Sequence, residues 1–147
     1  MKFEGEYLNG KWNGKGKVYN YDGKLQFEGE YLNGKRNGKG KEYYSNGKLE
    51  FEGEYINGEK NGKGKEYYTH DKLKFEGEYL NGKRNRKGKE YDYNNGKLKF
   101  EGEYLEGERN GKGKEYNYWN GKLEFEGEYL KGERNRKGKE YYFWKVN

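Results

Sequence analysis

The chain carries three copies of a glycine-rich pattern that could, by residue type, bind phosphate. Gly-x-x-x-x-Gly-Lys occurs at Gly5/Gly10/Lys11, Gly29/Gly34/Lys35 and Gly77/Gly82/Lys83. A phosphate-binding loop of this kind needs Ser or Thr after the lysine and then a helix. Trp12, Arg36 and Arg84 follow the lysines here, and the first glycine of each copy lies inside a segment that we expect to be a strand. The pattern therefore does not predict nucleotide binding.

Ser45, His70 and Asp71 are the residues whose types could form a nucleophile, base and carboxylate set. Ser45 and His70 fall in consecutive connectors of the expected sheet, which places them about 10 Å apart and beyond hydrogen-bond reach. One His and no Cys also leave no donor set for a transition metal. We expect turn-forming roles for these residues, and the sequence predicts no catalysis, no metal and no cofactor.

Glutamates recur in every part of the chain and could serve as acids or bases. Glu28, Glu30, Glu52 and Glu54 are followed in each case by lysines at fixed spacing. In the expected strand pairing each glutamate faces a lysine across the sheet. A solvated face of paired charges is therefore the favoured interpretation.

Composition separates this chain from ordinary globular domains. Hydrophobic residues make up 29% and charged residues 39%, but aromatic residues reach 19%, so burial must be concentrated in rings. Cys is absent, and no apolar run is long enough for a signal peptide or a membrane span. We expect a cytoplasmic protein, located at the cytoskeleton or peripherally on a membrane. The net charge of only +6, with glutamates near the lysines, argues against a nucleic-acid partner.

An internal repeat organises the whole sequence. Copies begin at Phe3, Phe27, Phe51, Phe75, Phe100 and Phe125. A fixed period of this size is typical of stacked arrays in which each unit contacts mainly its neighbours. We expect one array over residues 1–147, with units 3–26, 27–50, 51–74, 75–99, 100–124 and 125–147. The extra residue of the fourth and fifth units falls in the connector, where it predicts a longer turn or a bulge.

The pattern inside each unit predicts a β-hairpin. Residues 25–32 alternate between apolar or glycine positions and mostly charged ones, which is typical of a half-exposed strand. Residues 33–38 favour a turn, and residues 39–44 form a second extended run. Twelve such strands predict an all-β fold, a single-layer antiparallel sheet of six stacked hairpins that forms an open meander with a groove.

Spacing also predicts a register for the hairpin. If the turn is centred on residues 34–37, the cross-strand pairs are Tyr31 with Gly40, Gly29 with Glu42, Phe27 with Tyr44, and Glu30 with Lys41. Aromatic rings would then lie over glycines of the partner strand on one side of the sheet, and paired charges would cover the other.

These residues carry a family resemblance. Phe27, Gly29, Tyr31, Gly34, Gly38 and Gly40 fit the MORN repeat (membrane occupation and recognition nexus) position by position, and the pattern recurs in all six units. Arg86 and Arg136 replace the third glycine of the pattern in two units, and His70-Asp71 replaces the usual Asn-Gly between the third and fourth. The resemblance implies a stack of hairpins with a groove and a non-enzymatic role in scaffolding, protein binding or attachment near membranes.

An aromatic groove is the first candidate for a binding site. Exposed aromatic surface marks partner sites, and Tyr and Trp anchors dominate binding energies. We expect a protein or peptide to bind along the groove. The residues expected to line it are Phe27, Tyr31, Tyr44, Phe51, Tyr55, Phe75, Tyr79, Phe100 and Tyr104.

Basic residues near the hairpin tips give the alternative. Stacking would align them along one edge: Lys11, Lys35, Arg36, Lys60, Lys83, Arg84, Arg109 and Arg134. Such a stripe would attract anionic lipid headgroups at about 1 kcal/mol per cation. The same stripe also serves solubility without any ligand.

The last unit ends in an apolar stretch without a polar cap. We expect Tyr142, Phe143 and Trp144 to belong to a final edge strand. An uncovered strand of this kind predicts either self-association into a homo-oligomer through the terminal repeats or continuation of the array.

Overall fold

The computed structural model describes residues 1–142, except for the side chain of Arg136, and this part of the chain forms strands and turns without a helix. The strands are β1 (Lys2–Leu8), β2 (Lys11–Tyr19), β3 (Leu25–Leu32), β4 (Lys35–Tyr43), β5 (Leu49–Ile56), β6 (Glu59–Tyr67), β7 (Leu73–Leu80), β8 (Lys83–Tyr91), β9 (Leu98–Leu105), β10 (Glu108–Tyr116), β11 (Leu123–Leu130) and β12 (Glu133–Glu140).

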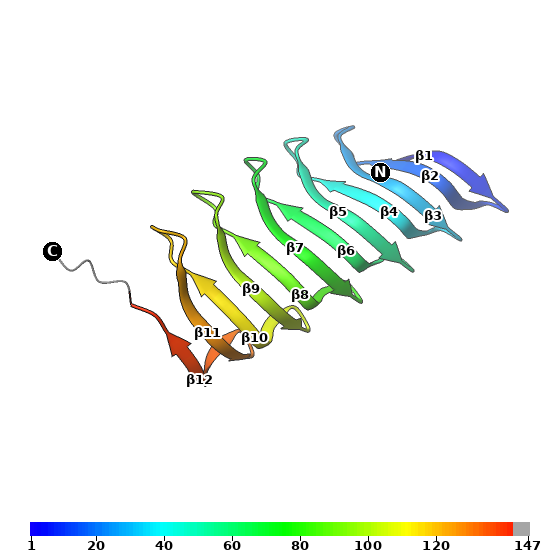
Figure 1. Cartoon of the computed structure of the whole chain (residues 1–147). Coiled ribbons are helices and arrows are strands. Elements are labelled where there is room, and N and C mark those ends of the chain that lie inside the picture. The colour runs from blue at the N-terminus through cyan, green and yellow to red at the C-terminus, as the bar shows by residue number, and fades with distance from the viewer. Residues whose placement is uncertain (143–147) are drawn as a thin grey trace.

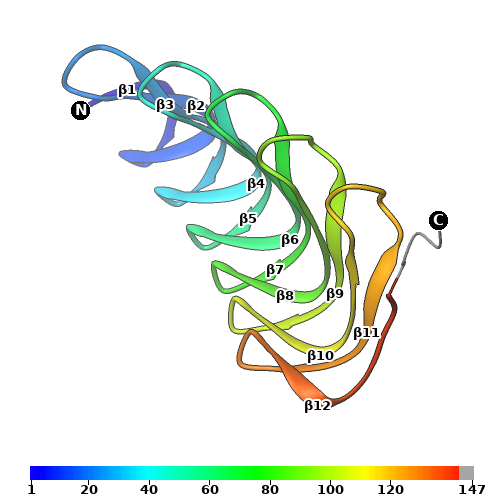
Figure 2. The same ribbon diagram turned by 90° about the vertical axis from the view of Figure 1, so that its left-hand side faces the viewer.

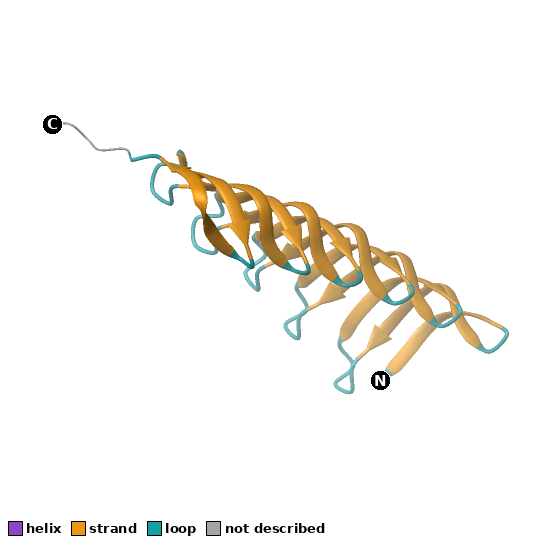
Figure 3. Cartoon of the chain, turned by 90° about the horizontal axis from the view of Figure 1, so that it is seen from below, coloured by secondary structure: helices purple, strands orange, loops and turns teal. Residues whose placement is uncertain are grey.

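All of these strands belong to one sheet in which spatial order follows chain order from β1 to β12. Every pair is antiparallel, so the chain runs as an uninterrupted meander (Figure 1). Hairpin tips lie along one long edge and connectors along the other, as the view in Figure 3 also shows. The predicted all-β, single-layer stack of hairpins is confirmed.

Each strand follows a hook rather than a straight line when the array is viewed along its length (Figure 2). Paired glycines lie in the middle of these strands, such as Gly29 and Gly40, whose Cα atoms face each other across β3 and β4. A Cβ atom on Gly29 would lie 2.7 Å from the Cα of Gly40, so only glycine allows this approach. The glycine pairs therefore allow neighbouring strands to approach closely along the whole ribbon.

The hairpin turns are shorter than the sequence pattern suggested. Asn33 and Gly34 form a two-residue turn with φ of 50° and 83°, the left-handed pair that a tight hairpin requires. The amide of Gly34 also donates to the carbonyl of Trp12 in the preceding hairpin, at 2.8 Å. Consecutive tips are thus tied together by the main chain.

The second Asn-Gly pair, Asn37-Gly38, forms a bulge and not part of the turn. Tyr31 faces Arg36 before the bulge, and Gly29 faces Gly40 after it. The predicted pairs Tyr31–Gly40, Gly29–Glu42, Phe27–Tyr44 and Glu30–Lys41 are therefore wrong. The observed pairs are Gly29–Gly40, Phe27–Glu42 and Glu28–Lys41, because the two-residue turn and the bulge shift the second strand.

The connectors account for the change in period. In the second unit the amide of Gly47 donates to the carbonyl of Tyr44, three residues earlier. In the fourth unit Gly96 donates to Asp92, four residues earlier. The predicted longer turn at the extra residue is confirmed.

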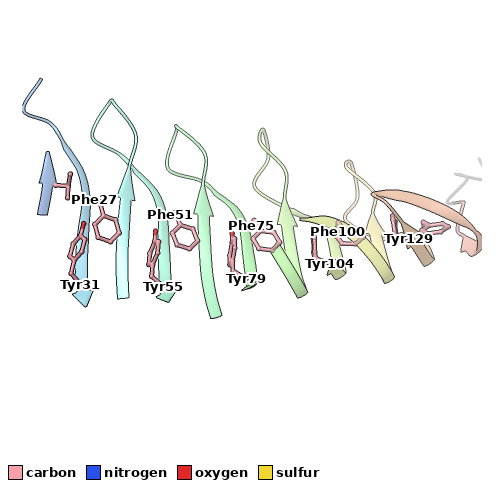
Figure 4. Packing of buried hydrophobic residues seen from close by; sticks show 11 residues of the cluster. Phe27, Tyr31, Phe51, Tyr55, Phe75, Tyr79, Phe100, Tyr104 and Tyr129 are labelled. Atoms are coloured by element: carbon pink, nitrogen blue, oxygen red, sulfur yellow. The ribbon is translucent and has the colours of Figure 1, made fainter. Parts of the chain in front are cut away.

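The core is one row of rings on one face of the sheet (Figure 4). Phe27, Phe51, Phe75 and Phe100 have 0% of their surface exposed. Each ring lies over glycine: a Cβ on Gly40 would stand 2.5 Å from Cζ of Phe27 and 3.1 Å from Tyr55. Neighbouring Phe and Tyr rings meet edge to face with centroids 5.1 to 5.8 Å apart. The general prediction of rings over bare backbone is confirmed, although the predicted partners are not.

Candidate functional site: a charged groove opposite a capped aromatic row

The aromatic face is closed and does not form a groove. Tyr31, Tyr55, Tyr79 and Tyr104 expose only 2 to 5% of their surface, and the phenylalanines between them expose none. Tyr44, also expected in the groove, is half-buried near a connector, and its hydroxyl donates to the carbonyl of Tyr67 at 2.6 Å. The expectation that these rings line an open binding groove is wrong, because packing uses them completely.

Basic side chains cover the phenylalanines. The guanidinium carbon of Arg36 lies 3.9 Å from the centre of the Phe27 ring, and Nζ of Lys60 lies 4.0 Å from the centre of Phe51. Arg84, Arg109 and Arg134 take the same position over Phe75, Phe100 and Phe125. These cations, expected at the tips, act instead as lids on the core.

The lids are neutralised by glutamates from the same face. Nη1 of Arg36 contacts Oε1 of Glu42 at 2.7 Å, and the hydroxyl of Tyr55 donates to the same oxygen at 2.8 Å. In the next unit Glu66 accepts from Arg84 and from Tyr79. Arg109 with Glu90 and Arg134 with Glu115 repeat the arrangement.

The pKa values of these groups follow from that geometry. Burial alone would raise the pKa of Glu66, but hydrogen bonds from Arg84 and Tyr79 and the charge of Arg84 hold it below its usual value. Burial and the neighbouring carboxylate raise the pKa of Tyr79. We call the sets Arg84–Glu66–Tyr79, Arg109–Glu90–Tyr104 and Arg134–Glu115–Tyr129 the Arg–Glu–Tyr ladders. Each contains a charged Arg–Glu pair and a protonated tyrosine at neutral pH.

The hairpin tips do not form a continuous basic stripe. Lys11, Lys35 and Lys83 are exposed at the tips of the first, second and fourth units, while Glu59, Glu108 and Glu133 occupy the same position in the others. A row of exposed aliphatic side chains runs beside them: Leu8, Leu32, Ile56, Leu80, Leu105 and Leu130, each 47 to 57% exposed. The tips thus offer an aliphatic row with lysines in three places.

In residues 1–142 a long groove lies on the face of the sheet opposite the aromatic rings. The groove runs from β1 to β11, with paired glycines as its floor and eleven glutamates and ten lysines around them. Within one hairpin the lining residues are Glu28, Gly29, Glu30, Lys39, Gly40 and Lys41. We call this surface the charged groove.

Cross-strand pairs order the charges of this groove. Glu28 faces Lys41 within the hairpin, and Lys39 faces Glu54 of the next unit. The predicted Glu/Lys alternation is therefore present, with partners shifted by the bulge. Oε2 of Glu30 also accepts from the amide of Lys39 at 2.7 Å, which holds the bulge.

Tyrosines form a border that the sequence analysis missed. The hydroxyl of Tyr43 donates to Oε1 of Glu28 at 2.5 Å, and Tyr67 donates to Glu52 at 2.7 Å. Burial and Glu52 together raise the pKa of Tyr67 to about 12. Tyr43 follows Lys39 and Lys41 at alternate positions, a spacing that places it on the charged face.

The residues considered for catalysis have separate structural contacts. Nε2 of His70 lies 2.8 Å from the carbonyl oxygen of Tyr93, and Asp71 pairs with Lys48 at 3.0 Å. Among residues 1–142 no cluster of three or more His, Cys, Asp or Glu side chains could hold a metal. The same part of the chain has no helix that could cross a membrane.

The C-terminal edge differs from the expected apolar strand. β12 ends at Glu140, and Tyr142 lies beyond it, 70% exposed. The expectation that Tyr142 belongs to a last strand is wrong. Phe143 and Trp144 lie outside the described residues.

Comparison with known protein families identifies the repeat unit. A model described as MORN repeat matches the chain six times, at residues 3–24, 27–48, 51–69, 75–97, 100–122 and 125–144. Each match begins at the phenylalanine that begins a unit. No match was found among curated proteins.

Proposed function

The chain belongs to the MORN repeat family, and from that premise we propose that it is a non-enzymatic scaffold that holds another polypeptide in the charged groove. The observation that carries this proposal is the continuity of the groove over eleven strands, with glycine along its floor. A long site with the same lining in successive hairpins suits a chain-like ligand better than a compact substrate.

The lining favours a polypeptide over a polyanion. Glutamates and lysines are almost equal in number, eleven to ten, so the groove has little net charge. Binding of nucleic acid relies on releasing counterions with an excess of cations. A peptide that presents both signs of charge in alternation would complement the Glu28–Lys41 type of pair.

Buried rings also favour this assignment. Phe51 and Tyr55 expose 0 and 2% of their surface, so a ligand on that face would meet the Arg and Glu lids first. The lids are already paired, as Arg36 is with Glu42. In the charged groove, by contrast, glycine main chain and charged side chains line the surface that a ligand would contact.

Selection of peptide binders from a displayed random library tests the proposal. Glu52 and Lys65 face each other in the groove, so exchanging them (E52K/K65E) keeps the pair and inverts the local charge pattern. We expect selected peptides to bind the exchanged variant at least ~10-fold more weakly, because charge patterns mainly set specificity. Glu52 also faces Lys41 and accepts from Tyr67, and Lys65 also faces Glu76, so the melting temperature of the variant is measured beside its affinity.

The same exchange at Lys83 and Glu106 is the control. These two side chains form an exposed pair at 3.3 Å outside the groove lining. Unchanged affinity in this variant supports the groove as the site. Binders that ignore E52K/K65E but lose affinity with the control exchange would overturn the proposal.

Attachment to anionic lipid is the second candidate, favoured by the aliphatic row at the tips. Leu8 and Leu32 are about half exposed and lie opposite Lys11 and Lys35 across their two-residue turns. An aliphatic side chain beside a lysine suits the interface between headgroups and acyl chains.

Flotation with vesicles of phosphatidylserine and phosphatidylcholine distinguishes this candidate. The lipid candidate predicts binding that decreases at high salt and in a Lys11→Glu/Lys35→Glu/Lys83→Glu variant. Exchange of Glu52 and Lys65 should leave vesicle binding unchanged, since those residues lie away from the tips.

A further inference from the structure

The two outer strands of the sheet, β1 and β12, carry the same residues that pair consecutive units inside the array. Within residues 1–142, β1 pairs only with β2 and β12 pairs only with β11. Everywhere inside the array, the second strand of one unit pairs with the first strand of the next, as β8 does with β9. β12 is a second strand and β1 is a first strand, so within the described residues each edge has the pairing groups that the other edge could use.

The match holds residue by residue. The β8–β9 pairs are Lys87–Glu103, Gly88–Gly102, Lys89–Glu101 and Glu90–Phe100. The corresponding residues on β12 and β1 are Lys137 and Glu6, Gly138 and Gly5, Lys139 and Glu4, and Glu140 and Phe3. The residue types are identical at all of these positions. β1 of a second copy would therefore offer β12 the same residues that β9 offers β8.

Side chains at the two edges lack contacts that their interior counterparts make. Tyr7 is 59% exposed, whereas Tyr104 at the same position of β9 is 4% exposed and donates to Glu90 at 2.7 Å. At the other edge, the space above Gly113 is filled by Tyr129, whereas among residues 1–142 the atoms nearest to the space above Gly138 belong to Phe125 and Glu126. Glu140 is half exposed, at 50% of its side chain.

We propose that copies of this chain associate head to tail, with β12 of one copy pairing antiparallel with β1 of the next. In this arrangement Tyr7 covers Gly138 of the neighbouring copy and donates to its Glu140. The contact uses two different surfaces and lies at opposite ends of the array (Figure 1), so it repeats without closing and gives linear filaments. The proposal concerns a second copy of the chain and is independent of what the charged groove binds.

Charge reversal in two separate variants tests the contact. Glu4→Lys places lysine opposite Lys139 of the neighbouring copy, and Lys139→Glu places glutamate opposite Glu4. Sedimentation velocity of the full chain should show larger species as concentration rises. Either variant alone should associate about 10-fold more weakly, because like charges face each other across the ladder.

Mixing the two variants is the decisive arm. The lysine introduced by Glu4→Lys then faces the glutamate introduced by Lys139→Glu, and the remaining junction keeps Glu4 opposite Lys139, so mixed filaments should recover the wild-type size. Glu4 and Lys139 also pair within their own chains, with Lys17 and Glu126. Mixing cannot reverse such intrachain effects, so recovery isolates the contact between copies.

A cysteine pair provides a second readout. The chain has no cysteine, so Glu4→Cys/Lys139→Cys introduces the only two thiols. Oxidation should give a ladder of covalent oligomers, because the two positions lie at opposite ends of one copy (Figure 1).

Lys35→Glu, at an exposed tip, is the control for the charge-reversal variants and should associate as wild type. A chain that stays monomeric at all concentrations, or variants that do not recover on mixing, would overturn the proposal.

Discussion

Glycine and phenylalanine act as a pair at the level of single residues. The floor glycine has no side chain, and the ring of the neighbouring strand occupies the space that a Cβ would need. At Gly64 that space already holds Phe51 carbons at 2.6 Å and a Tyr79 carbon at 3.0 Å. The sheet therefore gains a core although it has only one layer.

Gly64→Ala should lower the free energy of unfolding by about 2 kcal/mol, since the added methyl group overpacks a closed site. Urea denaturation followed by circular dichroism measures the change. Glu59→Ala, at an exposed tip of the same strand, should change stability by less than ~0.5 kcal/mol. Equal effects from the two substitutions would contradict the packing account.

Arg86 shows how a side chain changes the backbone and the hydrogen bond of the bulge. Its φ is 63°, where the other units mostly have glycine, such as Gly38 at 104°. The bulge hydrogen bond from Lys87 to Glu78 is also longer, 3.2 Å, than the 2.7 Å between Lys39 and Glu30. A Cβ at this position would approach the glutamate oxygen, as the 2.2 Å separation at Gly38 indicates.

Replacing Arg86 by glycine should therefore stabilise the protein, by about 1 kcal/mol, because left-handed backbone is costly for residues with a Cβ. The converse change, Gly62→Arg, should destabilise it by a similar amount. Thermal unfolding of both variants gives the comparison. A loss of stability in Arg86→Gly would show that the arginine contributes contacts of its own.

The first hairpin has apolar residues at two positions where the second hairpin has an ion pair. In the first unit Trp12 occupies the lid position of Arg36, and Val18 occupies the position of Glu42. Trp12 stacks on Phe3 with centroids 4.0 Å apart, and Val18 is buried at 6% exposure. Two apolar residues thus stand where the second unit has an ion pair, a difference that costs little when both members change together.

A double-mutant cycle on Trp12→Arg and Val18→Glu measures that coupling. The double variant should be more stable than the sum of the single changes predicts, by about 1 kcal/mol, since the introduced arginine and glutamate can pair as Arg36 and Glu42 do. Additive effects would mean that the lid and its partner act separately.

The Arg–Glu–Tyr ladders make stability depend on pH. The lowered pKa of Glu66, Glu90 and Glu115 means that their contribution is complete above the ordinary value of 4.5 and is lost as the pH falls through the lowered values. The melting temperature should fall on acidification below about pH 4.5, and the fall should be smaller in Glu66→Gln. A pH-independent melting temperature from pH 6 to pH 2 would exclude this role for the ladders.

How far the sequence predicts these elements depends on the two Asn-Gly pairs that each of the first three hairpins contains. Alternation in residues 25–32 was sufficient for the strands, and the unit boundaries followed from the phenylalanines. The register failed because Asn33-Gly34 and Asn37-Gly38 were assigned to a single turn, although Asn-Gly alone specifies a two-residue turn. The roles of Arg36 and Tyr43 depend on that register, so the lids and the tyrosine border were missed as well.

The whole molecule is quasi-one-dimensional, since each hairpin contacts its neighbours through repeated pairs. Deleting residues 51–74 removes one whole unit and joins Glu50 directly to Phe75, so that Glu50 takes the place of Lys74. The shortened chain should fold, with a urea m-value lower by roughly one sixth, because m scales with the surface exposed on unfolding. Deleting residues 51–62 instead, which removes most of β5 and the beginning of β6, should disrupt the array.

The assignment of one face to the core and the other to binding is tested most directly by nitration of tyrosines with tetranitromethane, followed by mass spectrometry. Tyr21 and Tyr142 are 92 and 70% exposed and should react quickly, whereas Tyr31, Tyr55, Tyr79, Tyr104 and Tyr129 should react only after denaturation. Rapid nitration of these five tyrosines in the folded protein would contradict a closed aromatic face and with it the placement of the binding site in the charged groove.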